Sequence, residues 1–201
     1  MNPIAALRAI WFRTAVPLWV LATGVRSCQG VRFFGLPVIS RVPGSTIEIG
    51  EACVICSDSR YTALGVSHPV VLRTIAPGAL IRIGANTGIS GASICAAACV
   101  TIGADCLIGA DTIIADTDFH PIEPDNRRGN SDAARVRSKP IHIGDNVFLG
   151  ARVLVLKGVT IGNDSVVGAG SIVRDDIPPA SIAFGNPAIV VGSVRNSIKK
   201  D

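Results

Sequence analysis

The chain has 201 residues, of which 48% are apolar and 17% are charged. This composition supports one folded domain with a substantial core and excludes a disordered chain. Aromatic residues make up only 4%, so Val, Ile, Leu and Ala must fill most of the core. The net charge of +4 lacks the dense basic patch that proteins binding duplex nucleic acid usually carry, so we predict no nucleic-acid partner.

The six cysteines do not indicate a disulfide framework, because the chain is much larger than the small secreted scaffolds that depend on one. We therefore predict a cytoplasmic protein. Cys53 and Cys56 have the spacing of half a zinc site, but no matching second pair follows, so we expect no metal. Cys53, Cys95, Cys99 and Cys106 are expected to be small core residues.

The N-terminal segment contains an uncharged apolar run at residues 14–25. This run is shorter than the roughly 20 residues that span a bilayer. Two arginines precede it as in a secretory signal, but no convincing small-residue cleavage site follows. We expect residues 1–40 to be partly helical and to pack on the domain. In the alternative, peripheral membrane contact, Trp11, Phe12 and Trp19 are the anchors.

A six-residue period dominates the second half of the chain. Aliphatic residues recur at every sixth position from Ile143 to Val173, and the same pattern runs through residues 102–115. An α-helix would place positions i and i+6 on opposite sides, so a helix is excluded. The fifth position of each hexad is small or β-branched, at Val147, Val153, Val159, Ser165 and Ser171.

Each hexad fits a short strand followed by a corner, with two side chains facing inward. Three hexads make one coil, and stacked coils place parallel strands about 4.8 Å apart. The period therefore predicts a parallel β-helix. Because connections between parallel strands are nearly always right-handed, physical rules alone favour a right-handed coil.

The hexads IGDNVF, LGARVL, VLKGVT, IGNDSV and VGAGSI, followed by DDIPPASIAFGNPA, resemble those of the hexapeptide-repeat acyltransferases. The segment ADTDFHPIEP is similar to that of the maltose and galactoside O-acetyltransferases and of their relatives in surface-polysaccharide biosynthesis. The resemblance covers residues 81–191. It implies an all-β fold: a left-handed parallel β-helix over residues 41–191, after a short helical segment and before a C-terminal tail at residues 192–201.

Two interruptions break the repeat, and insertions in stacked repeats form surface loops. The first, near residues 61–78, contains an extended segment whose place, in a decorated coil or at an edge, stays open. The second, residues 120–140, is highly charged and is expected to protrude and bind a ligand. Arg127 and Arg128 in this loop are candidate contacts for the acceptor.

His120 is the only one of three histidines that lies where the repeat stops and the charged loop begins. A histidine can take the proton of a hydroxyl that attacks a thioester and then give it to the leaving thiolate. The resemblance implies this general-base role for His120. Asp118 shares a strand face with it and is a candidate to orient the imidazole. The favoured alternative is that Asp116 and Asp118 cap the bend.

Acetyl-CoA is the donor that the resemblance implies, with its pantetheine arm in a groove between adjacent β-helices. Ala151 and Ala169 occupy the positions where relatives bind the arm through the backbone. Arg174 and Lys157 are the candidate ligands of the phosphates. Phe148 stands where the galactoside enzyme has tryptophan, which leaves the identity of the acceptor open. The resemblance also implies a homotrimer with three sites between subunits.

The sequence thus predicts an acetyl-CoA-dependent O-acetyltransferase that modifies a sugar or a polysaccharide precursor. One alternative is an N-acyltransferase of amino-sugar nucleotides, or an antibiotic-modifying relative, because the same base serves an amine. A zinc carbonic anhydrase needs three close histidines, and His120 and His142 are badly spaced for it. A non-enzymatic β-helix scaffold is the last alternative.

Overall fold

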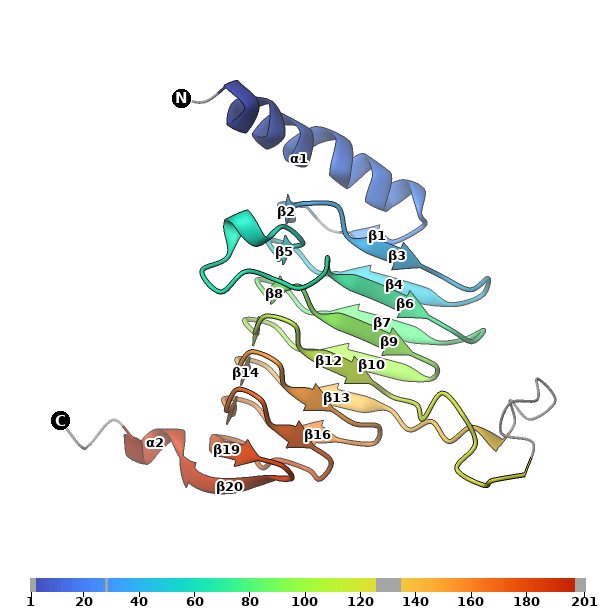
Figure 1. Cartoon of the computed structure of the whole chain (residues 1–201), viewed down its shortest axis with the longest axis vertical. Coiled ribbons are helices and arrows are strands. Elements are labelled where there is room, and N and C mark those ends of the chain that lie inside the picture. Colours follow the sequence, from blue (N-terminus) through green and yellow to red (C-terminus); the bar gives the residue numbers. More distant parts are fainter. Residues whose placement is uncertain (1–2, 28, 126–134, 198–201) are drawn as a thin grey trace.

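The computed structural model describes residues 3–27, 29–125 and 135–197. Its short strands form three sheets that make the sides of a triangular prism (Figure 1). From β1 to β18, consecutive strands along the chain fall in sheets A, B and C in turn, and stacked coils pair in parallel. The fold is the expected left-handed parallel β-helix of hexapeptide repeats.

The strands of each sheet follow the coils from the N-terminal to the C-terminal end. Sheet A contains β1 (Arg26–Ser27), β4 (Thr46–Ile49), β7 (Leu80–Ile83), β10 (Cys99–Ile102), β13 (Ile141–Ile143) and β16 (Thr160–Ile161). Sheet B contains β2 (Arg32–Phe34), β5 (Val54–Cys56), β8 (Gly88–Ser90), β11 (Leu107–Ile108), β14 (Phe148–Leu149), β17 (Val166–Val167), β19 (Ser181–Gly185) and β20 (Ala188–Ser193). Sheet C contains β3 (Val38–Ser40), β6 (Val71–Thr74), β9 (Ser93–Ala96), β12 (Ile113–Ala115), β15 (Leu154–Val155) and β18 (Ile172–Val173).

The inward positions predicted from the six-residue period are buried. Val147, Val153 and Val159 are at most 1% exposed, and the aliphatic residue two positions after each is also buried. Ser165 and Ser171 fill the same position in the next coil and donate their hydroxyls to the carbonyls of Pro178 and Gly168. The small fifth position therefore leaves room for the aliphatic side chains that fill the prism.

The glycine that follows the aliphatic residue is required by the close stacking of the coils. At Gly50 a Cβ atom would lie 2.6 Å from the backbone nitrogen of Ala85 in the next coil. The amide of Gly50 donates to the carbonyl of Ile83 at 2.8 Å, which holds the two corners together. A larger residue at Gly50 would push these two coils apart, so this corner needs glycine.

Helix α1 (Pro3–Ala22) covers the N-terminal end of the prism (Figure 1). Phe12, Val16 and Val20 are buried in the same cluster as the β-helix core, so the packing that we expected is confirmed. The opposite face of the helix is also apolar, and Leu18 is 68% exposed. In the part of the chain that the structure describes, no helix is long and apolar enough to cross a membrane.

The β-helix begins earlier than residue 41, because β1, β2 and β3 form a first coil at residues 26–40. The extended segment of the first interruption is strand β6, which pairs with β3 and β9. It is the third side of the second coil and therefore part of the β-helix. The inserted segment is therefore residues 57–70, which includes the short helix η1 (Ser59–Tyr61). At the C-terminal end, β20 turns back antiparallel on β19 before helix α2 (Val194–Ser197).

Cys53, Cys56, Cys95, Cys99 and Cys106 form no disulfide among the described residues, and only some of them are core residues. Cys53 and Cys106 are fully buried, as expected. The prediction was wrong for Cys95 and Cys99, which are partly exposed because they lie on the outward positions of β9 and β10. Partial burial raises the pKa of both thiols, so they are protonated at neutral pH.

Candidate active site

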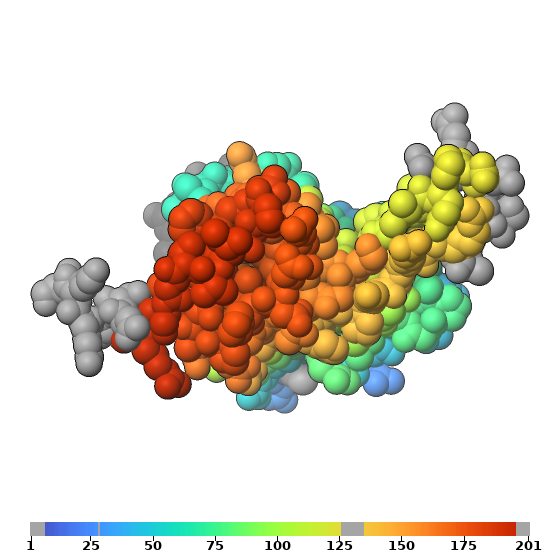
Figure 2. Space-filling view, turned by 90° about the horizontal axis from the view of Figure 1, so that it is seen from below, coloured from blue at the N-terminus to red at the C-terminus, as the bar shows by residue number. Residues whose placement is uncertain are grey.

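The charged loop leaves the prism at the edge where sheet C meets sheet A, and its visible part extends well beyond the body (Figure 2). A short antiparallel stem forms its base. The amide of Lys139 donates to the carbonyl of Asp116 at 2.9 Å, and the amide of Asp118 donates to the carbonyl of Arg137 at 3.1 Å. Arg127 and Arg128, the expected acceptor contacts, lie outside the described residues.

Asp116 is a structural residue at the start of this stem. Its carboxylate is fully buried and accepts the amides of Ala97 at 2.7 Å, Ala98 at 2.8 Å and Cys99 at 2.7 Å. These three bonds fix the turn from β9 into β10, one coil nearer the N-terminal end than the loop. The bend-capping alternative is therefore the one that the structure supports for Asp116.

His120 lies two residues beyond the stem, with its side chain exposed to solvent. Its amide donates to the carbonyl of Asp118 at 2.7 Å. The residue before it, Phe119, has a φ of 62°, a left-handed conformation that costs a bulky residue about 1–2 kcal/mol. This conformation turns the backbone between Asp118 and His120.

The carboxylate of Asp118 contacts Lys157, with Oδ1 and Nζ 2.5 Å apart. Lys157 comes from the coil below, directly after β15, and both side chains are about three-quarters buried. The other carboxylate oxygen of Asp118, Oδ2, is buried and has no hydrogen-bond partner among the described residues. Lys157, expected to bind phosphate, thus holds Asp118 beside the backbone of His120. Asp118 keeps one acceptor oxygen available.

A groove of about 450 Å³ follows a different edge, where sheet B meets sheet C. Ala110, Ala151 and Ala169 line it from the same corner position of three successive coils. Leu64 and Gly65 of the first insertion close one side. The two alanines predicted to contact the pantetheine arm are therefore neighbours in one groove.

The remaining predicted residues are dispersed. Arg174 follows β18 at the same edge as His120, is largely exposed and contacts Asp175. Phe148 lies on the outward face of β14, between Leu107 and Val166 of the adjacent coils. Within one chain, His120, Lys157 and Arg174 occupy the C–A edge, and Ala151 and Ala169 occupy the B–C edge.

His68 is a polar residue that the sequence analysis did not select. It lies in the first insertion and lines a large cleft against α1. His68 also lies inside an interruption of the repeat, which is one part of the signal that singled out His120. No group of three or more His, Cys, Asp or Glu side chains with the geometry of a metal site occurs among the described residues.

The sequence matches the family described as the hexapeptide repeat of succinyl-transferase at residues 99–115 and 140–174. The galactoside O-acetyltransferase of Lactococcus lactis is 41% identical over 98 residues, which are 49% of this chain and 45% of that enzyme. The structure of the polySia-specific acetyltransferase NeuO is 27% identical and aligns with a TM-score of 0.60 over 84% of this chain and 75% of its own. A galactoside acetyltransferase in complex with coenzyme A is 28% identical, with a TM-score of 0.56 over 86% of this chain and 67% of its own.

The resemblance to the hexapeptide-repeat acyltransferases is confirmed. The two segments that match the hexapeptide repeat enclose residues 116–139, which include His120. This chain spans less than half the length of the curated relatives that it matches.

Proposed function

We propose that the protein is an acetyl-CoA-dependent O-acetyltransferase that modifies a hydroxyl of a sugar or of a polysaccharide precursor. The observation that carries the proposal is the groove in which Ala151 and Ala169 stack. A groove lined mainly by alanine and glycine residues suits an extended thioester arm, which needs amide partners rather than specific side chains. The likeness to galactoside O-acetyltransferase and to a structure with bound coenzyme A supports the same donor.

His120 is the general base in this proposal. Its imidazole takes the proton of the acceptor hydroxyl as the oxygen attacks the thioester carbonyl carbon. When the tetrahedral intermediate collapses, the carbon–sulfur bond breaks and the imidazolium gives the proton to the departing thiolate. The products are an acetyl ester and free CoA, and His120 returns to its starting state.

Asp118 is proposed to orient His120. The buried Oδ2 atom without a partner is an acceptor that an imidazole N–H can satisfy when the substrates close the site. Lys157 holds the carboxylate from the other side through its contact with Oδ1. Asp118→Asn is expected to reduce kcat more than KM, because the imidazolium then loses its charged partner.

The active unit is proposed to be a homotrimer. His120 and the alanine-lined groove lie at opposite edges of sheet C, so one chain alone does not bring base and donor together. A closed ring of three subunits would place the C–A edge of one protomer against the B–C edge of the next. Each of the three interfaces would then hold one complete site.

Peripheral membrane contact through α1 is proposed as well. Its exposed face presents Leu7, Leu18 and Leu21 together with Trp19, and the helix contains no acidic residue. A helix that is apolar on both faces usually has both covered, and an interfacial helix uses Trp and Leu in this way. Such contact would bring the enzyme to an acceptor carried on a lipid.

The test is release of free thiol from acetyl-CoA with a panel of neutral sugars, uronic acids, nucleotide sugars and amino sugars. His120→Ala is expected to lower turnover by about 10²–10⁴ without changing the oligomeric state. His142→Ala is the matched control, because His142 lies on the outer face of β13 and contacts Thr101. Full turnover in His120→Ala would refute the base assignment, and faster turnover of amino sugars would favour the N-acyltransferase.

A further inference from the structure

A second cavity lies near the N-terminal end of the prism, between α1 and the first insertion. It is an open cleft of about 760 Å³. Arg8 and Trp11 line it from the helix, and Asp58, Arg60 and His68 line it from the inserted segment. None of the catalytic or donor-binding residues discussed above faces this cleft.

The tautomer of His68 is set by its neighbour. Its Nδ1 atom lies 2.7 Å from the carbonyl oxygen of Pro69. Because a carbonyl oxygen can only accept, Nδ1 carries the proton and the neutral ring has its lone pair on Nε2. His68 therefore offers a fixed hydrogen-bond acceptor from a half-buried position in the cleft.

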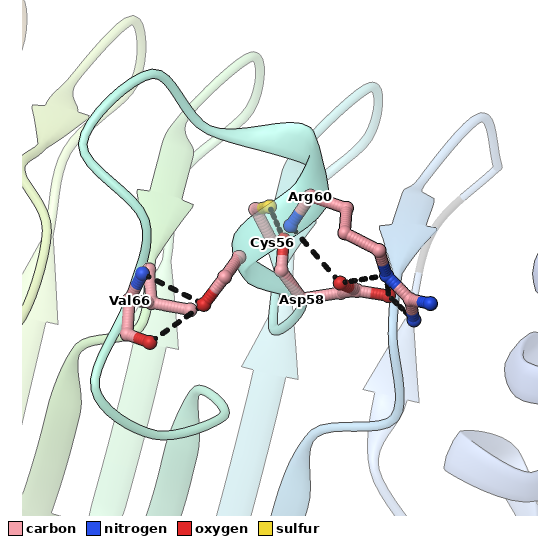
Figure 3. Close-up of polar contacts among 5 residues, drawn as sticks. Cys56, Asp58, Arg60 and Val66 are labelled. Atoms are coloured by element: carbon pink, nitrogen blue, oxygen red, sulfur yellow. Dashed lines mark hydrogen bonds and ion pairs between the residues drawn. The ribbon is translucent and has the colours of Figure 1, made fainter.

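Asp58 and Arg60 pair with each other in the cleft, and Arg8 is a further positive side chain that can bind a ligand. Asp58 and Arg60 form a closely matched pair, in which the Nε atom of Arg60 lies 2.8 Å from Oδ1 and Nη2 contacts Oδ2 (Figure 3). The hydrogen bond from Arg60 is the main reason why the pKa of Asp58 lies below its usual value, and the charge of Arg8 acts in the same direction. Arg8 is half-buried and has no hydrogen bond to another side chain among the described residues. Two arginines against one carboxylate give the cleft a net positive charge.

The wall of the cleft is held rigid. The hydroxyl of Ser59 donates to the carbonyl of Val66 at 2.8 Å and accepts a hydrogen bond from the amide of Val66 at 3.1 Å (Figure 3). These two bonds link the beginning and the end of the insertion. Ser67 donates its amide and hydroxyl to the carboxylate of Asp111 at 2.8 and 2.6 Å. Burial by itself raises the pKa of Asp111, but the bonds from Ser67 outweigh it and the pKa is lowered. A prearranged wall reduces the entropy lost when a ligand binds.

The insertion separates this cleft from the alanine-lined groove. Leu64 and Gly65 face the groove, whereas Ser57–Arg60 and Val66–Pro69 face the cleft. Asp111, which anchors Ser67, also lines the groove. Both sites therefore stand on the B–C edge, on the two sides of one short segment.

We propose that the cleft binds the acyl acceptor, and that the acceptor is a saccharide carrying a negative group. Arg8 binds the carboxylate or phosphate, the half-exposed ring of Trp11 covers an apolar sugar face, and Nε2 of His68 accepts a sugar hydroxyl. This inference rests on the proposed function, because it assigns the second substrate of the same reaction. It names the chemical class of that substrate and the residues that bind it.

The experiment measures equilibrium binding of three small probes to the full-length protein without acetyl-CoA. Methyl β-glucuronide carries a carboxylate, glucose 1-phosphate carries a phosphate, and methyl β-glucoside is the neutral control. Titrations followed by ligand-observed NMR suit the weak binding expected of single sugars. At least one charged probe is expected to bind about tenfold more tightly than the neutral one, and the preferred probe identifies the anion.

Arg8→Gln is expected to abolish the tenfold preference and leave the neutral probe unchanged. Arg13→Gln is the matched control, since it removes the same charge from an exposed position of α1 outside the cleft. His68→Ala is expected to weaken all three probes. Equal effects of Arg8→Gln and Arg13→Gln, equal affinity of wild type for charged and neutral probes, or displacement of the probe by CoA would each overturn the inference.

Kinetics separate this inference from the proposed function. Arg8→Gln is expected to raise KM for an anionic acceptor about tenfold with kcat maintained. Thiol release that depends on His120 but shows no preference for anionic acceptors would overturn the inference and leave the proposed function standing. Anion-selective binding in a protein that transfers no acetyl group would support the site as an anionic-saccharide site and refute the acetyltransferase.

Discussion

Replacing Asp116 with asparagine is expected to lower the free energy of unfolding by about 1.5–3 kcal/mol. The carboxylate accepts three amides, from Ala97, Ala98 and Cys99, in a fully buried position. Ala98 and Cys99 both donate to Oδ2, so asparagine can keep these two bonds with its oxygen at that position, but its NH₂ group then faces the amide of Ala97. One hydrogen bond to a charged group is lost, at about 1.5–3 kcal/mol.

The assay is urea unfolding followed by circular dichroism, at one fixed protomer concentration because an oligomer is stabilised by association. Asp105→Asn is the control: this exposed carboxylate accepts one bond, from the side chain of Asn86 at 2.6 Å, and its loss should cost less than about 1 kcal/mol. A loss below about 1 kcal/mol for Asp116→Asn would refute the argument that this carboxylate fixes the turn.

Three further predictions concern the backbone and the exposed helix. Phe119→Gly should be more stable to urea than Phe119→Ala by about 1 kcal/mol, because both remove the ring but only glycine relieves the positive φ; equal stability would contradict the strain. Gly50→Ala should lower the unfolding free energy by about 1–3 kcal/mol, whereas Gly192→Ala, which has open space around it, should change it by less than about 0.5 kcal/mol; a harmless Gly50→Ala would show that the coils can separate. Wild type should sediment with vesicles of phosphatidylglycerol and phosphatidylcholine, and Leu18→Glu should stay in the supernatant with its circular dichroism unchanged; equal sedimentation would remove α1 from the contact.

The interior of the β-helix could be predicted from the sequence because each hexad repeats the same physical requirement. An aliphatic residue, a small residue and a glycine at fixed spacing determine which side chains face inward, and Val147, Val153 and Val159 all follow this rule. The left-handed sense came from the resemblance alone. Spacing says nothing about the direction in which the coils turn.

The first coil could not be recognised because its packing is different. It lies under α1 and fills its interior with the large ring of Phe33, which is buried against the helix side of the core. The aliphatic–glycine pattern is therefore absent from residues 26–40. The position of Arg8 in the cleft could not be predicted either, because only the packing of α1 on the first coil brings it beside residues 57–70.

The site was predictable in part. The place of His120 at the base of a loop follows from the end of the repeat, and the shared groove of Ala151 and Ala169 follows from their equal positions in successive coils. The pairing of Asp118 with Lys157 was not predictable, because it joins two side chains 39 positions apart that meet only when the loop stem folds. Their contact depends on tertiary structure, which local patterns do not encode.

The cover that α1 places on the first coil also limits how the molecule can associate. A stack of parallel strands ends in rows of unpaired amides and carbonyls, and such edges recruit strands from other molecules. By burying Phe12, Val16 and Val20 on that end, the helix obstructs end-to-end joining of β-helices into fibres. At the other end, the antiparallel return of β20 interrupts the parallel register of sheet B. Growth of the solenoid is thereby stopped at a defined length, and association is directed to the sides of the prism.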